Sequence, residues 1–107
     1  MKTFIPPQFV ADAAKRALRW IEEGKAGSGF TSVGRTRARQ LADRQPVSED
    51  TIKRMRSYFA RHAVDKQATG FKAGEDNFPT PGRVAWDAWG GDAGETWSNR
   101  VKLTGEE

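Results

Sequence analysis

The sequence predicts an all-α fold, a compact bundle of four to five short helices with a helix-turn-helix-like central pair. Apolar residues recur at spacings of three and four in several stretches, which is typical of the buried face of a helix. No stretch alternates apolar and polar residues with a period of two, the pattern of a half-buried strand. Proline, glycine and helix-capping residues separate the helical stretches. The 107 residues suit one domain, 1–107, with an N-terminal extension over 1–7 and a frayed tail over 104–107.

The first helix is predicted over residues 8–23. Pro6-Pro7 can open it, because a missing N–H is harmless in the first turn of a helix. Gly24 is expected to end it. The apolar stripe that should be buried consists of Val10, Ala14, Ala17, Leu18 and Ile21. Trp20 lies off the centre of this stripe, so it either packs at an edge or exposes its ring.

Residues 24–32 form a glycine-rich loop that fits neither of two phosphate-binding patterns. A Walker loop needs glycine where Arg19 stands, and a dinucleotide fingerprint needs glycine where Ser32 stands. We interpret the loop as a linker between helices, with a phosphate-contacting turn as the alternative.

The second helix is predicted over residues 33–44, before the break at Pro46. Arg35 and Arg39 are four residues apart and share one face. The buried side is expected to consist of Val33, Ala38, Leu41 and Ala42.

The third helix, predicted over residues 49–63, is the most amphipathic stretch. Ser48 is a good N-cap, and acids follow it in the first turn, where the helix dipole favours them. The apolar arc consists of Ile52, Met55, Phe59, His62 and Ala63. The opposite, polar arc consists of Lys53, Arg54, Ser57 and Arg61.

Residues 64–80 are expected to be irregular, and two helices should follow. Thr80 offers an N-cap and Pro81 a first helical position for a helix over 81–89. A final helix over 93–103 is predicted from a capping-box variant, Asp92 with Glu95, and should bury Trp97 and Val101. Three tryptophans lie in this region: Trp86, Trp89 and Trp97. They fill the core, form a stacking platform for bases or anchor a protein partner, and the core is the favoured interpretation.

Charge is divided unevenly along the chain. Eighteen basic and fourteen acidic residues give a net charge of +4. Residues 15–61 alone carry +7, whereas residues 62–107 carry −3. A basic half favours an anionic partner, and a solvated arginine-rich helix surface is the alternative. The candidate nucleic-acid-binding residues are Arg35, Arg37, Arg39, Arg44, Lys53, Arg54 and Arg61.

These residues would contact phosphates rather than read bases. In a helix-turn-helix the start of the second helix enters the major groove, but here Glu49 and Asp50 occupy that start and would repel phosphates. We therefore expect salt-sensitive binding to the nucleic-acid backbone. A protein-interaction module is the second hypothesis.

The composition argues against several classes of site. The chain has no cysteine and one histidine, which excludes disulfides, thiolate zinc sites and a multi-histidine metal site within one chain. His62 with Asp65 is the only acid/base pair worth naming, and a hydrogen-bonded histidine is the favoured interpretation. We expect no enzyme activity, no cofactor and no metal.

No stretch has the length and apolarity of a signal peptide or a membrane span, so we expect no secretion signal and no membrane partner.

Several segments together form a recognisable pattern: Ser48-Glu49-Asp50-Thr51-Ile52-Lys53-Arg54-Met55, Tyr58-Phe59-Ala60-Arg61-His62, Asp65-Lys66, Gly82, Ala85-Trp86, Trp89-Gly90-Gly91-Asp92, Gly94 and Trp97. These segments resemble a small domain that tailed bacteriophages encode widely, alone or fused to head proteins such as prohead proteases. Under this resemblance, a protein-interaction module would act in phage head assembly or bind a host protein. The resemblance covers about residues 10–103, and Trp-Gly-Gly-Asp is its most specific part. Trp-Asp-Ala-Trp before the two glycines departs from the more aliphatic pattern of relatives. The family has no assigned activity, so the resemblance implies a setting, host cytoplasm or virion, and no catalytic residues.

Overall fold

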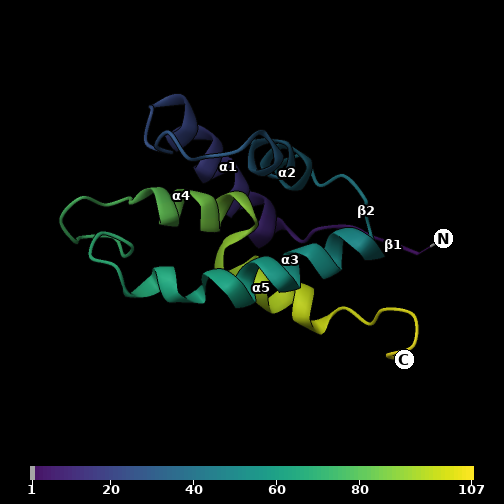
Figure 1. Ribbon diagram of the computed structural model, residues 1–107. Coiled ribbons are helices and arrows are strands. Elements are labelled where there is room, and N and C mark those ends of the chain that lie inside the picture. Colours follow the sequence, from purple (N-terminus) through teal and green to yellow (C-terminus); the bar gives the residue numbers. More distant parts are fainter. Residues whose placement is uncertain (1) are drawn as a thin grey trace.

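The computed structural model describes residues 2–107 and confirms the all-α prediction (Figure 1). The helices of the described chain are α1 (Gln8–Glu22), α2 (Ser32–Ala42), α3 (Glu49–His62), α4 (Pro81–Ala88) and α5 (Gly91–Arg100). A 3₁₀ helix, η1 (Ala63–Gln67), extends the end of α3. Two very short strands, β1 (Thr3–Phe4) and β2 (Val47–Ser48), pair antiparallel with Thr3 opposite Ser48.

Two of the predicted helix starts are confirmed in detail. The Ser48 side chain accepts a hydrogen bond from the backbone N–H of Thr51 at 3.2 Å, which caps α3. Thr80 accepts one from the N–H of Arg83 at 3.1 Å, and Pro81 takes the first position of α4. Each cap satisfies an N–H that has no acceptor within the first turn of a helix.

The predicted start of the last helix is wrong. The N-cap of α5 is Gly90, whose φ of 112° places it in the left-handed region, and no side chain caps this helix. The Asp92 carboxylate instead accepts a hydrogen bond from the Trp86 indole N–H at 2.9 Å. The helix ends at Arg100 rather than 103, so Val101 lies beyond it and is only half-buried, like Trp97.

Helix α1 is the central element of the bundle and packs against α2, α4 and α5 (Figure 1). Helix α2 packs mainly on α1 and α4, whereas α3 packs mainly on α5. The pair α2 and α3 is thus joined by the predicted turn at Pro46, but each helix finds most of its neighbours elsewhere. This arrangement leaves the polar face of α3 accessible to solvent.

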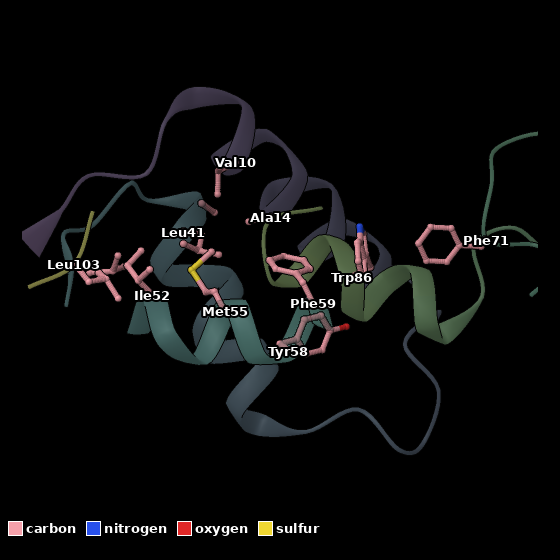
Figure 2. Close-up of a cluster of buried hydrophobic side chains, with 12 residues drawn as sticks. Val10, Ala14, Leu41, Ile52, Met55, Tyr58, Phe59, Phe71, Trp86 and Leu103 are labelled. Atoms are coloured by element: carbon pink, nitrogen blue, oxygen red, sulfur yellow. The ribbon is translucent and has the colours of Figure 1, made fainter. Parts of the chain in front are cut away.

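The core runs between α1, α3 and α4, as Figure 2 shows with Val10, Met55, Phe59 and Trp86. Trp86 is a core residue as expected. The predicted apolar faces of α1 and α3 are confirmed for most of their length, since the buried residues are Val10, Ala14, Ala17, Ile52, Met55 and Phe59. At the ends of these faces Leu18, Ile21 and His62 are half-buried, and Ala63 is exposed, contrary to the prediction. The prediction that Val33 is buried is wrong, because its side chain is exposed. Its neighbour Gly34 is buried instead, since the ring of Phe30 covers it.

Residues near both ends of the described chain make contacts with the bundle. Pro6 is fully buried and the strand β1 pairs with β2. In the tail, the Glu106 carboxylate accepts hydrogen bonds from the Arg56 guanidinium at 2.7 and 3.0 Å and from the N–H of Leu103 at 3.1 Å. Arg56 also donates to the backbone oxygens of Ser98 and Val101, so it fixes the end of α5.

Candidate nucleic-acid interface

The exposed face of α3 lines a groove of about 410 Å³, here called the basic groove. Its residues are Val33, Lys53, Arg54, Ser57, Arg61 and Trp89. The groove forms because Ile52, Met55 and Phe59 of α3 are buried, which turns the four polar residues of this set outward. Three of the seven predicted nucleic-acid-binding residues therefore share one surface.

The cations of the basic groove differ in their partners. Arg54 donates to the Asp50 carboxylate one turn earlier at 2.8 Å, and this hydrogen bond lowers the pKa of Asp50. Asp50, one of the two acids in the first turn of α3, is thus already paired with a cation. Lys53 and Arg61 are exposed and have no hydrogen-bonding or ionic partner within residues 2–107. Their charges are available to an anion.

Arg37 lies beneath this surface rather than on it. Its guanidinium sits 5.3 Å from the centre of the Trp89 ring and donates to Gln40 and, at 3.5 Å, to the hydroxyl of Thr51. Burial lowers the pKa of Arg37, and its Nε is buried with no partner in the described chain. The structure gives Arg37 a supporting position against Trp89.

The other predicted arginines lie apart from the basic groove. Arg35 and Arg39 line a second groove of about 440 Å³ between α1 and α2, together with Arg19. Arg19 is not among the residues predicted for the site, although the helical spacing of α1 puts it on that helix's polar side. Arg44 donates from Nε to the backbone oxygen of Pro6 at 2.8 Å and thereby holds the N-terminal segment.

An aromatic pocket of about 580 Å³ adjoins the basic groove, because Trp89 lines both cavities. The Trp89 ring is stacked on Tyr58, with ring centres 4.7 Å apart and planes at 7°. Tyr58 also stacks on His62 at 4.5 Å. The pocket residues are Ala26, Gly27, Ser28, Gly29, Phe30, Thr31, Gly34, Tyr58, His62, Pro81, Ala85 and Trp89.

Tyr58 is the residue of this region that sequence reasoning missed. The signal that could have found it is its spacing of four from His62, which puts both rings on one side of α3. Tyr58 is 5% exposed, and its hydroxyl has no hydrogen-bond partner among the residues that the structure describes. Burial raises the pKa of the hydroxyl, so it remains a protonated donor at neutral pH.

The expected pairing of His62 with Asp65 is present. The imidazole Nδ1 lies 3.1 Å from the Asp65 carboxylate, and the ring is half-buried rather than in the core. No group of three potential ligands within residues 2–107 is placed to hold a metal ion. No helix in the same part of the chain is long and apolar enough to cross a membrane.

A separate charged cluster lies on the other side of α4. The Asp87 carboxylate is buried and accepts hydrogen bonds from Nε of Arg16 at 2.8 Å and Nε of Arg83 at 3.2 Å. Burial raises the pKa of Asp87, and the two guanidiniums oppose that shift. Because Arg83 also donates to the backbone oxygen of Phe71 at 2.7 Å, the cluster ties α1 and α4 to the preceding loop.

Comparison of the chain with protein-family models, with curated proteins and with solved structures finds no match.

Proposed function

We propose that this protein is a non-catalytic binder of nucleic acid that contacts phosphates through the basic groove on α3. The observation that carries the proposal is the pair of unpartnered cations, Lys53 and Arg61, on either side of Ser57 in one hollow surface within residues 2–107. Cations with no internal partner are free to neutralise phosphates, and this releases the counterions condensed on the nucleic acid, a large source of affinity for its backbone.

The arginines on α2 divide into two roles under this proposal. Arg35 and Arg39, with Arg19, offer a second set of phosphate contacts in the groove between α1 and α2. Arg37 and Arg44 act indirectly, because their guanidiniums already hold Trp89 and Pro6 in place. The resemblance to a phage-encoded domain sets the proposed function in the host cytoplasm or the virion.

A salt titration tests the proposal. Binding of a fluorescent oligonucleotide, followed by anisotropy, should weaken at least about tenfold between about 50 and 200 mM salt, the loss expected when two phosphates are neutralised. The double variant Lys53→Gln/Arg61→Gln should bind more weakly at every salt concentration. Its slope of log affinity against log salt should also be smaller, by about one for each phosphate that the variant no longer neutralises.

A charge-matched control separates the groove from net charge. The double variant Lys72→Gln/Lys102→Gln removes the same charge from exposed positions outside the groove and should bind like the wild type. Equal decreases in affinity in both double variants would overturn the assignment to the basic groove. Failure of the wild type to bind DNA or RNA at low salt would overturn the nucleic-acid function altogether.

One observation favours a second candidate function, recognition of a phage or host protein. Phe9 is 78% exposed on α1 and lies beside a groove of about 380 Å³ that Pro7, Val10 and Trp97 also line. Exposed aromatic side chains beside a groove are typical anchors of protein interfaces. If this face binds a protein, the Phe9→Ser variant should no longer capture that partner from a host or virion lysate. The Val64→Ser variant, changed at another exposed apolar position, should still capture it. Equal capture by both variants would exclude this face.

A further inference from the structure

We infer that the aromatic pocket beside the basic groove receives one unstacked nucleobase, so that the protein prefers single-stranded nucleic acid to duplex. The inference rests on the proposed function, since the groove must first hold the backbone of the strand. Trp89 belongs to both cavities, so a strand whose phosphates lie on Lys53 and Arg61 runs along the rim of the pocket.

The walls of the pocket suit a flat ring. Phe30, Pro81 and Ala85 supply apolar surface, and the half-buried imidazole of His62 supplies a further ring. Aromatic side chains bind bases in this way with little dependence on sequence, because every base has a π face. The glycine-rich loop over 26–29 closes one side of the pocket without large side chains, which leaves about 580 Å³ of space.

The Tyr58 hydroxyl is the polar group that distinguishes this pocket from a simple packing defect. Figure 2 shows the hydroxyl at the Trp86 end of the core, and Tyr58 is one of the residues that line the pocket. Its ring is fixed by stacking against Trp89 and His62, and the hydroxyl is buried with no partner in residues 2–107. Buried hydroxyls nearly always have a partner, and a carbonyl oxygen or ring nitrogen at the edge of a base would supply one.

The charges around the two cavities explain why the base enters the pocket while its phosphates stay outside. Lys53, Arg54 and Arg61 line the basic groove, whereas none of the described residues that line the aromatic pocket is a lysine or arginine. The carboxylate of Asp65 is bound to His62 at the pocket and would repel a phosphate there. In a duplex the bases are already stacked and paired, so a duplex can use the groove but not the pocket.

The test compares four ligands of matched length by anisotropy at low salt. They are a single strand of DNA, the same strand as RNA, the DNA duplex, and a DNA strand with abasic sites, which keeps the phosphates and lacks bases. The wild-type protein should bind at least one intact single strand about tenfold more tightly than the duplex and the abasic strand, as expected for one stacked base.

Two variants locate the effect in the pocket. Tyr58→Phe removes one oxygen atom and keeps the ring, and it should lower single-strand affinity about fivefold while leaving duplex affinity unchanged. Phe30→Ala should lower the affinity for the single strand by at least as much, because it removes an aromatic wall of the pocket. If Phe30→Ala fails to fold, as judged by its thermal melt, Tyr58→Phe decides the question alone.

The outcomes separate this inference from the proposed function. Equal binding of intact, abasic and duplex ligands, together with an unchanged Tyr58→Phe variant, would overturn the pocket and leave the phosphate contacts standing. Weaker binding of every ligand by Lys53→Gln/Arg61→Gln is the result expected if the groove holds the backbone. If no ligand binds the wild type at low salt, both the pocket and the groove are wrong.

Discussion

Asp87 is the residue whose environment differs most from that of an ordinary surface acid. It is 1% exposed and lies between the guanidiniums of Arg16 and Arg83, of which Arg16 is 38% exposed. Removing one member of a buried ion pair leaves the other charge without compensation, at a cost of about 3–5 kcal/mol when both are buried. Because Arg16 retains solvent, we expect Asp87→Asn to lower the free energy of unfolding by about 3 kcal/mol, the lower end of that range.

Urea denaturation of the variant measures this change. Asp43→Asn is the matched control, since Asp43 is exposed and has no partner within residues 2–107, and it should change the free energy of unfolding by less than about 0.5 kcal/mol. If Asp87→Asn were as stable as this control, the guanidiniums of Arg16 and Arg83 would be solvated well enough that they need no carboxylate partner.

Contacts of this kind mark the limit of sequence reasoning at the scale of single residues. Asp87 and Arg16 are 71 positions apart, and helical periodicity relates only residues within a few turns of each other. The same limit applies to Arg37, whose stacking on Trp89 joins α2 to the end of α4. The sequence predicts the helix face on which each charged residue lies, but not which charged residues contact each other.

At the scale of elements, the turn between α4 and α5 depends on glycine. Gly90 has a φ of 112°, and a Cβ atom built there would lie 2.9 Å from the Cα of Gly94 and 3.0 Å from a side-chain carbon of Val10. We expect Gly90→Ala to lower the free energy of unfolding by about 2 kcal/mol, because the left-handed conformation and the close approach both oppose a side chain. Thermal or urea unfolding measures the change.

Gly29→Ala is the control for this prediction. The φ of Gly29 lies outside the left-handed region, and no atom lies within 4 Å of the position that a Cβ atom would take there. This variant should be neutral or slightly stabilising, since alanine reduces the freedom of the unfolded chain. If the two variants were equally stable, the turn would be able to rearrange around a side chain at position 90.

This turn also shows why some elements were predicted correctly and one was not. Ser48 and Thr80 cap their helices through hydrogen bonds to residues three positions later, which is a local pattern that a sequence displays. Asp92 has the residue type of such a cap, but the Trp86 indole and Lys66 bind its carboxylate instead. The Trp-Gly-Gly-Asp stretch thus contains two positions, Gly90 and Asp92, that the fold itself requires.

At the scale of the whole molecule, strand β1 and the C-terminal tail lie at the same end of the bundle (Figure 1). Strand β1 pairs with β2, and Arg44 holds the oxygen of Pro6. In the tail, Thr104 donates twice to the Glu49 carboxylate, at 2.7 and 2.8 Å. Charged side chains that are distant in the sequence therefore close the fold, while the polar arc of α3 remains exposed.

The attachment of the tail should depend on pH through Glu106. Hydrogen bonds from Arg56, and then from the N–H of Leu103, lower the pKa of Glu106 from 4.5 to about 2. A carboxylate with a depressed pKa in the folded state stabilises that state above its unfolded pKa, and the stabilisation disappears as the pH falls through the folded value. Wild type should therefore melt at a higher temperature than Glu106→Gln near pH 7, and the difference should vanish toward about pH 2.

Thermal melts of both proteins across this pH range test the prediction. Asp76→Asn, which removes an exposed carboxylate that has no partner in the described part of the chain, corrects for the general effect of removing one negative charge. A difference between wild type and Glu106→Gln that stays constant from about pH 7 to pH 2 would mean that Glu106 acts through a neutral hydrogen bond, since only the ionised form responds to protonation. If Glu106→Gln melts at the wild-type temperature at every pH, the tail is not held by Arg56 at all.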